Sequence, residues 1–227
     1  MSIGWADCAA PPAYPTLKGV KRGSVYEVER VVVGPLETNC YLICKGSECL
    51  VVDPGAEPER IAERLAGRGV AAIVATHLHF DHVGAVEALA ERFRAPFIAH
   101  RADWELREVF ARVAESWGFE APRLPEPSPA GAELPLGLRA LHVPGHTPGS
   151  IAVLGDGFVL TGDLLFRGSV GRTDLPGGDW ETLVRSVCSL YELPPSYAVL
   201  PGHGPPTTLG REARANYFVP QSTCKKY

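Results

Sequence analysis

Four short segments rich in histidine, aspartate and glycine each follow directly after a run of apolar residues. These segments are THLHFDH at 76–82, PGHTPG at 144–149, TGD at 161–163 and PGHG at 201–204. Apolar runs bounded by turn residues are typical of buried strands, so each segment is predicted to lie where a strand ends. Side chains beyond the carboxyl ends of strands gather at one edge of a sheet. The chain is therefore constrained to a fold that brings four strand ends to one place.

Strands and helices are predicted to alternate in both halves of the chain. The continuous apolar run at 70–76 is typical of a strand covered on both faces, whereas 181–193 has apolar residues at helical spacing. Further strands are expected at 25–33, 39–44, 48–53, 95–99, 138–143, 150–154, 158–162 and 197–200, and further helices at 58–68, 83–93, 102–117 and 210–218. The proline-rich stretch 118–136 predicts a loop that borders or covers something. This alternation predicts an α/β domain in four layers, with helices outside two sheets.

We expect this domain to span 24–218, with an N-terminal extension at 1–23 and a C-terminal tail at 219–227. The net charge is −4 and no dense basic stripe occurs, which argues against nucleic acid or an anionic membrane as a partner. No apolar run approaches the roughly 18–20 residues of a membrane helix. The N-terminus lacks the pattern of a secretory signal, so a cytoplasmic location is expected. The sequence does not indicate an oligomeric state.

The cysteines show no CxxC pair and no zinc-finger spacing. Cys40 and Cys44 share one face of a predicted strand, too far apart to bridge each other, whereas Cys44 and Cys49 could face each other across a hairpin. In a cytoplasmic protein the sequence favours unpaired thiols, with Cys188 in a helix core. Only two asparagines, one glutamine and one methionine occur. That scarcity suits a thermophilic source, where intracellular disulfides form, although a GC-rich genome favours a similar composition.

Three imidazoles and one carboxylate occur within six residues, in the segment His77-Leu78-His79-Phe80-Asp81-His82. Imidazole nitrogens suit zinc, iron and other transition ions, and a carboxylate adds an anionic ligand. The later segments add His146, Asp163 and His203, each next to glycine, which allows close approach of the backbone. A single carboxylate such as Asp163 could bridge two cations. Together these segments predict a binuclear metal site.

In order and context, the four segments resemble the motifs of the metallo-β-lactamase superfamily, over residues 25–218. Within it, the segments NCYL, VDPG, GDLLFRGSVGR and GHGPPTTLGREARAN look like those of short glyoxalase II-like hydrolases. The resemblance implies an αββα sandwich with the site at one edge of the paired sheets. It also implies a ligand set, in which one metal is held by His77, His79 and His146, the second by Asp81, His82 and His203, and Asp163 bridges the two.

Such a site is suited to hydrolysis. Two divalent cations that share a water lower its pKa toward neutrality and hold hydroxide ready to attack. They also polarise a substrate carbonyl and stabilise the oxyanion that forms, while Asp81 is expected to orient the hydroxide. The resemblance implies a small-molecule thioester substrate such as S-lactoylglutathione. Its thiolate leaving group needs little acid assistance. We expect zinc, and iron or manganese would also suit these donors.

Three further residues, outside the ligand set, have other expected roles. Asp53, at a strand end, is expected to hold the far N–H of a ligand histidine, with a plain turn aspartate as the alternative. His100 and His142 match no ligand position, so we expect them to be structural hydrogen-bonding residues.

The segment Gly171-Arg172-Thr173-Asp174 supplies the candidates for substrate binding, Arg172 and Thr173. Arg172 could pair with a substrate carboxylate, and a structural salt bridge is the alternative. Full-length glyoxalase II enzymes carry a basic C-terminal helical segment that helps bind glutathione. Only 24 residues follow His203 here, so recognition of glutathione is left open.

The same segment also resembles persulfide dioxygenases, superfamily members that use one iron held by residues matching His77, His146 and Asp163. The PGHG and TTLG segments follow the hydrolase pattern, so hydrolysis is favoured. A metal-dependent binding module without turnover is a third possibility, and the complete ligand set argues against it. β-Lactamase activity is not expected, because no signal peptide is recognised.

Overall fold

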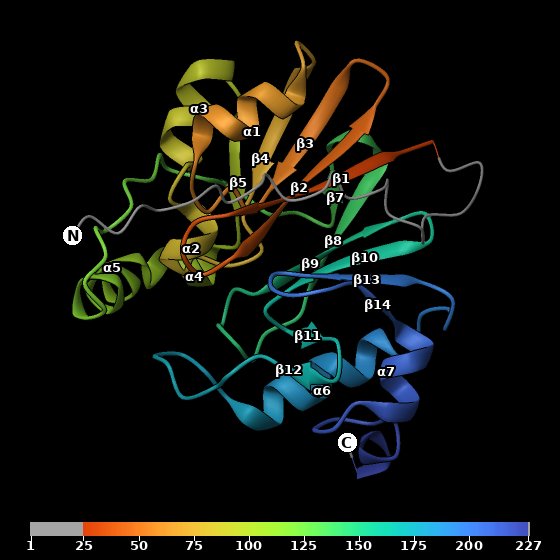
Figure 1. Ribbon diagram of the computed structural model, residues 1–227. Helices are drawn as coiled ribbons and strands as arrows, with labels where there is room; N and C mark the ends of the chain where they lie inside the picture. The colour runs from red at the N-terminus through yellow and green to blue at the C-terminus, as the bar shows by residue number, and fades with distance from the viewer. Residues whose placement is uncertain (1–24, 227) are drawn as a thin grey trace, which may run out of the picture.

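Two six-stranded sheets lie face to face at the centre of the computed structural model, which describes residues 25–226 (Figure 1). The first has the order β1-β2-β3-β4-β5-β6, with β1 Glu27–Val33, β2 Thr38–Lys45, β3 Glu48–Val52, β4 Gly69–Val74, β5 Phe97–Ala99 and β6 Ser128–Pro129. The second has the order β14-β13-β10-β9-β8-β7, with β7 Glu133–Leu134, β8 Leu138–His142, β9 Ile151–Gly155, β10 Phe158–Gly162, β13 Ala198–Pro201 and β14 Thr207–Thr208. The extension expected at 1–23 lies outside the described residues.

Helices cover the outer face of each sheet (Figure 1). Those beside the first sheet are α1 Pro58–Leu65, α2 Phe80–Val83, α3 Val86–Phe93, α4 Arg101–Glu105 and α5 Arg107–Ser116, and those beside the second are α6 Trp180–Leu190 and α7 Leu209–Ala215. The remaining elements are the hairpin of β11 Leu165–Phe166 and β12 Ser169–Val170 and the 3-10 helices η1 Pro135–Gly137 and η2 Thr223–Lys226. The predicted four-layer αββα sandwich is confirmed. Between residues 25 and 226, no helix combines the length and apolar character needed to cross a bilayer.

Three apolar layers hold the sandwich together. The layer between the sheets contains Leu50 and Val52 of β3 with Phe158 and Leu160 of β10. Val51 of β3 points the other way, into the layer beneath the helices, because successive side chains of a strand alternate between its faces. The third layer joins the second sheet to α6 and α7. Burial on both faces explains why the central strands read as continuous apolar runs.

The helix predicted at 102–117 is two helices, α4 and α5. Leu106 separates them with φ −99° and ψ 4°, outside the helical range, and its N–H donates to Asp103 O at 2.9 Å. Trp117, which has the helical spacing of the apolar residues Leu106, Phe110 and Val113, is 45% exposed. It follows the last residue of α5 and meets the ring of Phe80 edge-on, with centroids 6.0 Å apart. The apolar periodicity runs through Leu106 without interruption, so the pattern alone does not predict the break.

The helix predicted at 83–93 is α3 over most of its length, and Gly84 and Ala85 separate α3 from the short helix α2 before it. Ala85, between them, donates its N–H to Pro54 O at 2.9 Å. A Cβ on Gly84 would collide with Gly55 O, so only glycine permits this approach. The loop after β3 therefore docks where the predicted helix is interrupted, directly beside the first histidine segment.

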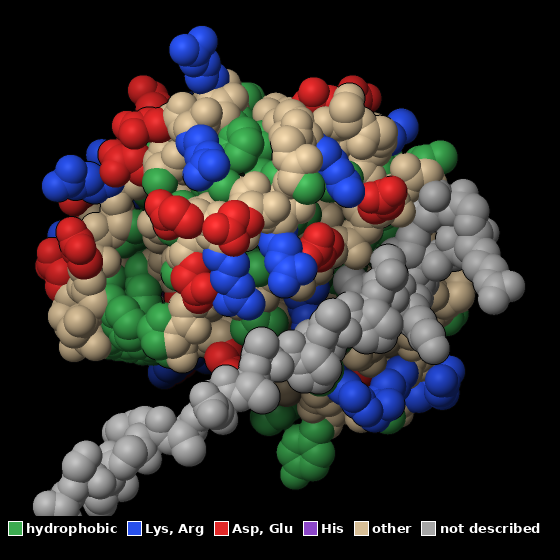
Figure 2. Space-filling model, turned by 45° about the horizontal axis from the view of Figure 1, so that its top comes forward, with side chains coloured by type: hydrophobic (Ala, Val, Ile, Leu, Met, Phe, Trp, Pro, Cys, Tyr) green, Lys and Arg blue, Asp and Glu red, His purple; other side chains and the backbone are tan. Residues whose placement is uncertain are grey.

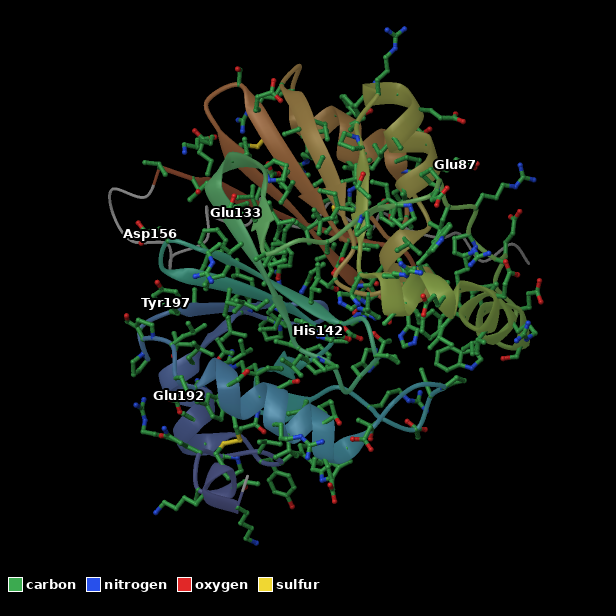
Figure 3. The ribbon with its side chains drawn as sticks, turned by 180° about the vertical axis from the view of Figure 1, so that it is seen from behind. Glu87, Glu133, His142, Asp156, Glu192 and Tyr197 are labelled. Atoms are coloured by element: carbon green, nitrogen blue, oxygen red, sulfur yellow. A yellow bond between two sulfur atoms is a disulfide. The ribbon has the colours of Figure 1, made fainter. Side chains whose placement is uncertain are left out.

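Two disulfides join four of the cysteines, visible as yellow bonds in Figure 3, so the expectation of unpaired thiols is wrong for them. Cys44 and Cys49 lie directly opposite each other in the β2–β3 hairpin, as the alternative interpretation allowed. Cys188 of α6 bonds to Cys224, 36 residues later in the chain. Cys40 is buried and is the one free cysteine among the residues described.

The packed part of the chain continues beyond residue 218, where a tail was expected to begin. Val219 is completely buried, and its carbonyl accepts the Tyr191 hydroxyl at 2.8 Å. The Cys188–Cys224 disulfide holds the following residues against α6. The described part of the expected tail, 219–226, is thus fastened to the second sheet's helical layer.

Candidate metal centre

Seven histidine and aspartate side chains from four segments meet at one end of the sandwich. The segments follow β4, β8, β10 and β13, and the first of them includes α2, which carries Asp81 and His82. The donor atoms form three groups within which all atoms lie within 4.8 Å of one another, namely His77, His79 and His146; His77, His82 and Asp163; and Asp81, His82 and His203. The structure therefore brings together all the residues that the sequence analysis named as metal ligands.

Asp163 lies between the two outer groups. Its Oδ2 is 3.8 Å from His146 Nε2 and 3.7 Å from His203 Nε2. Its Oδ1 is 3.4 Å from His82 Nε2. One carboxylate thus contacts histidines of both groups, which is the geometry required of a bridge between two cations.

Backbone carbonyls fix the proton position on two of the histidines. His146 Nδ1 lies 2.7 Å from Arg172 O, and His203 Nδ1 lies 3.0 Å from Leu36 O. Because a carbonyl can only accept a hydrogen bond, each Nδ1 carries the proton. Each Nε2 therefore presents a lone pair to the site.

Asp53 fixes the proton positions on two more histidines. Its Oδ2 accepts from His82 Nδ1 at 3.0 Å and from the Thr76 hydroxyl at 2.7 Å. Since that hydroxyl gives its only proton to Asp53, it must accept from His77 Nδ1, which is 3.1 Å away. His77 and His82 then both direct an Nε2 lone pair inward. Asp53 is buried, and its contact with His82 has the geometry expected from the sequence.

These proton positions aim several lone pairs at one volume. His77 Nε2 and Asp163 Oδ1 are buried with no hydrogen-bond partner, and His146 Nε2 faces His79 Nδ1 at 3.0 Å. The Nε2 atoms of His82 and His203 face each other at 3.3 Å. Buried polar atoms nearly always have a partner, so this arrangement calls for a positive charge among them. Divalent cations fit, because imidazole and carboxylate donors together are their usual ligands.

The pKa shifts of the site residues also indicate a need for positive charge. Burial, reinforced by the neighbouring histidines, lowers the pKa of His77 far below its usual value, and it lowers that of His79 to about 3. Burial alone would raise the pKa of Asp163, but the charge of His82 and nearby histidines brings it to about 2. Burial opposes protonation of His82, yet three surrounding carboxylates raise its pKa well above the usual value. The site thus attracts positive charge, either as a proton on His82 or as metal cations.

Thr38 is a site residue that the sequence analysis missed. Its hydroxyl is buried and donates to Asp81 Oδ2 at 3.0 Å. The same oxygen lies 3.2 Å from His203 Nε2. Next in the chain, the Asn39 amide donates to Pro201 O at 2.9 Å. The start of β2 therefore supports both the first histidine segment and the last one, and the only sequence signal for this was the NCYL segment.

Arg172 and Thr173, the candidates for substrate binding, behave differently from each other. The Arg172 side chain is paired with Asp174, with Nε to Oδ1 at 2.7 Å and Nη2 to Oδ2 at 2.6 Å. Its guanidinium also lies over the Trp117 ring, 5.6 Å from the centroid. This matches the salt-bridge alternative, although Arg172 lines the cavity over the site. Thr173 is not among the described residues that line it.

Two adjoining cavities open beside the donors. The smaller, about 210 Å³, lies over the site and is walled by Leu36, Phe80, Val113, Trp117, Arg172 and Leu175. The larger, about 440 Å³, runs between the β1–β2 loop and residues 119–123, and it shares Leu36, Phe80 and Asp81 with the smaller. The proline-rich loop at 118–136, predicted to border or cover another feature of the molecule, thus borders the larger cavity. The charged residues that line this cavity are Asp81, Glu87, Glu120 and Arg123.

His100 and His142 stand apart from the donor set. Their rings stack with centroids 4.2 Å apart at an angle of 9°. His142, labelled in Figure 3, contacts Pro148 O at 2.8 Å, and His100 Nδ1 accepts the Ala102 N–H at 3.3 Å. Both make the structural hydrogen bonds expected of them.

Two proteins of similar sequence carry hydrolase names. "Probable metallo-hydrolase YqgX" of Bacillus subtilis (strain 168) is 38% identical over 205 residues, which cover 84% of this chain and 96% of that protein. "Hydroxyacylglutathione hydrolase GloC" of Haemophilus influenzae is 34% identical over 218 residues, which cover 85% of this chain and 97% of that protein.

Solved structures share the fold over most of the chain. TTHA1623 in a di-iron-bound form is 45% identical with a TM-score of 0.78, covering 85% of this chain and 100% of that one. The B3 metallo-beta-lactamase BLEG-1 is 32% identical with a TM-score of 0.76, covering 85% and 99%. ETHE1 from Myxococcus xanthus is 26% identical with a TM-score of 0.67, covering 83% and 82%. A family model described as "Metallo-beta-lactamase superfamily" matches residues 33–203. The chain therefore belongs to the metallo-β-lactamase superfamily.

Proposed function

We propose that this protein is a binuclear metal-dependent hydrolase that cleaves small-molecule thioesters of the S-lactoylglutathione type. The observation that carries the proposal is the position of Asp163, which contacts histidines of both donor groups. The similarity to YqgX and GloC supports hydrolysis in general, and the similarity to GloC supports a glyoxalase II-like substrate.

The residues of the site divide the work between holding metal and guiding the reactants. His77, His79 and His146 would hold one cation, and Asp81, His82 and His203 the other. When bound, two such cations acidify a shared water and polarise the substrate carbonyl. The Thr38 hydroxyl holds Asp81 in place, so that Asp81 Oδ2 can accept a hydrogen bond from an attacking water and orient it. A thiolate is stable near neutral pH, so its departure requires no acid from the protein.

The cavities suggest how a thioester would lie. The acyl end would enter the smaller cavity, against the apolar walls formed by Leu36, Val113 and Trp117. The thiol half would extend past Phe80 into the larger cavity, where Glu87 and Glu120 outnumber Arg123. Glu87 projects from α3 in Figure 3. A lining without a basic cluster does not favour a strongly anionic thiol, so we propose that glutathione is accepted without high selectivity.

The metal, the partner and the cellular location are also proposed. We retain zinc as the first choice of metal, and the di-iron-bound relative supports iron as well. We also retain a small-molecule partner and a cytoplasmic location. On the face seen in Figure 2, basic and acidic side chains are interspersed, which supports the proposal that nucleic acid and membrane are not partners.

Metal analysis combined with a substrate series tests the proposal. The purified full chain should contain about two metals and hydrolyse S-lactoylglutathione, and Asp163→Ala should abolish both properties. Thioesters of an uncharged thiol should be cleaved with a kcat/KM similar to or higher than that of S-lactoylglutathione. Metal uptake without cleavage of any thioester, ester or lactone would refute hydrolysis and favour a binding module.

A persulfide dioxygenase is the second candidate, because the segment Gly171-Arg172-Thr173-Asp174 resembles that of such enzymes. That activity would need a single iron at His77, His146 and Asp163. Oxygen uptake in the presence of a persulfide, with one iron per chain, would replace the hydrolase proposal. Retention of that oxygen uptake by His203→Ala would show that the second donor group is not used.

A further inference from the structure

A buried carboxylate on α4 joins the two loops that carry three of the histidines. Asp103 is completely buried and lies outside every motif identified in the sequence. Its Oδ2 accepts the Leu78 N–H at 3.0 Å and the Thr147 hydroxyl at 2.9 Å, and its Oδ1 accepts the Gly149 N–H at 2.6 Å. One side chain therefore ties the loop after β4 to the loop after β8.

The three contacts lie next to metal donors in the chain. Leu78 stands between His77 and His79, and Thr147 directly follows His146. These three histidines are the complete first donor group. The second group has other supports, because Thr38 contacts Asp81 and Leu36 O contacts His203.

We infer that Asp103 is a positioning residue that sets the spacing of His77, His79 and His146 and so tunes the metal affinity of that group alone. The inference rests on the metal-binding part of the proposed function and not on the choice of substrate. It differs from a general contribution to stability, because it predicts a loss confined to one of the two groups.

Gly149 gives independent support for this close connection. A Cβ at Gly149 would lie 2.6 Å from both the backbone nitrogen and Oδ1 of Asp103, which real Cβ atoms do not tolerate. Burial raises the pKa of the Asp103 carboxyl, whereas the hydrogen bonds from Thr147, Leu78 and Gly149 favour its charged form. The loop after β8 is thus built to approach this carboxylate.

Asp103→Asn is the informative variant. An amide keeps the shape of the side chain but has only one acceptor oxygen, so the Leu78 N–H or the Gly149 N–H must face an NH₂ group. Glu212→Gln is a matched control, because Glu212 is also buried and accepts three hydrogen bonds. Its partners, the Gly168 N–H, the Thr207 hydroxyl and the Asn216 amide, lie outside both histidine loops.

Zinc affinity can be measured one group at a time in the full chain. His203→Ala weakens the second group and leaves the first, while His79→Ala does the reverse. Each protein is stripped with a chelator and titrated with zinc against a chromophoric competitor. In the His203→Ala background, Asp103→Asn should weaken zinc binding about 10–100-fold, the usual effect of losing an outer partner of a metal site. In the His79→Ala background the change should be less than about threefold, and Glu212→Gln should change neither affinity.

The possible results separate this inference from the proposed function. Equal losses at both groups, or none at either, would overturn the role of Asp103. Absence of zinc uptake by the unmutated chain would instead overturn the metal centre itself. If Asp103→Asn does not fold, Thr147→Val removes one of the three hydrogen bonds with little change of shape. It should still weaken zinc binding by the first group selectively, and an unchanged affinity would again overturn the inference.

Discussion

Asp53 determines the proton positions of two site histidines, so its substitution should be felt by the metals. Asp53 accepts three hydrogen bonds, from the Thr76 N–H, the Thr76 hydroxyl and His82 Nδ1. Asp53→Asn cannot accept all three, so His77 and His82 lose their fixed orientation. We expect metal affinity to fall about 10–100-fold, measured as zinc retained in a series of metal buffers. Retention equal to that of the unmutated chain would show that Asp53 is only a turn residue.

The ligand assignment itself is tested by single alanine variants. His77→Ala and Asp163→Ala should abolish metal binding and activity, because His77 belongs to two donor groups and Asp163 contacts histidines of both outer groups. His142→Ala should retain most of both, since His142 contacts only Pro148 O and the ring of His100. Elemental analysis of the purified variants provides the measurement. Loss of metal from His142→Ala would mean that the assignment is wrong.

At the residue scale, sequence could predict the donors and one of their supports, Asp53, but not the other supports. Histidines and aspartates in dense segments carry a chemical signature, and those residues do converge. The carbonyls of Leu36 and Arg172 have no such signature, because every residue has one. Thr38 and Asp103 are ordinary residues in sequence, and only their tertiary contacts distinguish them.

At the scale of elements, a disulfide joins the segment after α7 to α6. The Cys188–Cys224 disulfide closes a loop of 36 residues, whereas Cys44–Cys49 closes one of 5. Because a longer closed loop restricts the unfolded chain more, loss of the first should cost about 4 kcal/mol and loss of the second about 2 kcal/mol. Guanidinium unfolding of Cys188→Ser/Cys224→Ser and of Cys44→Ser/Cys49→Ser checks this order. Similar losses, or the reverse order, would contradict it, and metal content should be unchanged in both.

Local elements were predictable where local pattern determines them. The hairpin of β9 and β10 turns at the expected residues, with Phe158 paired to Gly155. The pairing of Cys188 with Cys224 depends on contact between distant segments, and no local pattern marks the break at Leu106. The short strands β11, β12 and β14 have two residues each, too few for any periodicity to appear.

Over the whole molecule, two buried phenols link stability to alkaline pH. Burial raises the pKa of Tyr41 and of Tyr191 above the ordinary value. Tyrosines of the unfolded chain ionise at about pH 10. Above that pH the unfolded state loses protons that the native state keeps, so stability is full below it and falls as pH rises. Denaturant midpoints measured from pH 7 to beyond about pH 10 test this. Tyr191→Phe should reduce the alkaline slope, and an unchanged slope would exclude Tyr191 as its source.

The metal centre is also where the two sheets are joined. Asn39 of the first sheet donates its N–H to Gly202 O at 2.7 Å, and Tyr41 donates its hydroxyl to Pro201 O at 2.9 Å. The loops after β4 belong to one sheet and those after β8, β10 and β13 to the other. Alternation of strands and helices predicts two sheets, but it does not show that the donors are divided between them. We therefore expect metal binding to stabilise the contact between the two sheets.

Removal of the metals should consequently lower the stability of the entire domain. A ligand present at 100 times its Kd stabilises the native state by about 2.7 kcal/mol, which corresponds to about 5–10 °C in Tm for a domain of this size. We expect a shift of at least this size after chelation, seen equally by tryptophan fluorescence and far-ultraviolet circular dichroism. Asp163→Ala, which cannot bridge the two groups, should show almost no shift on chelation. A shift reported by one probe and not the other would mean that the halves unfold separately, and that the donors do not unite them.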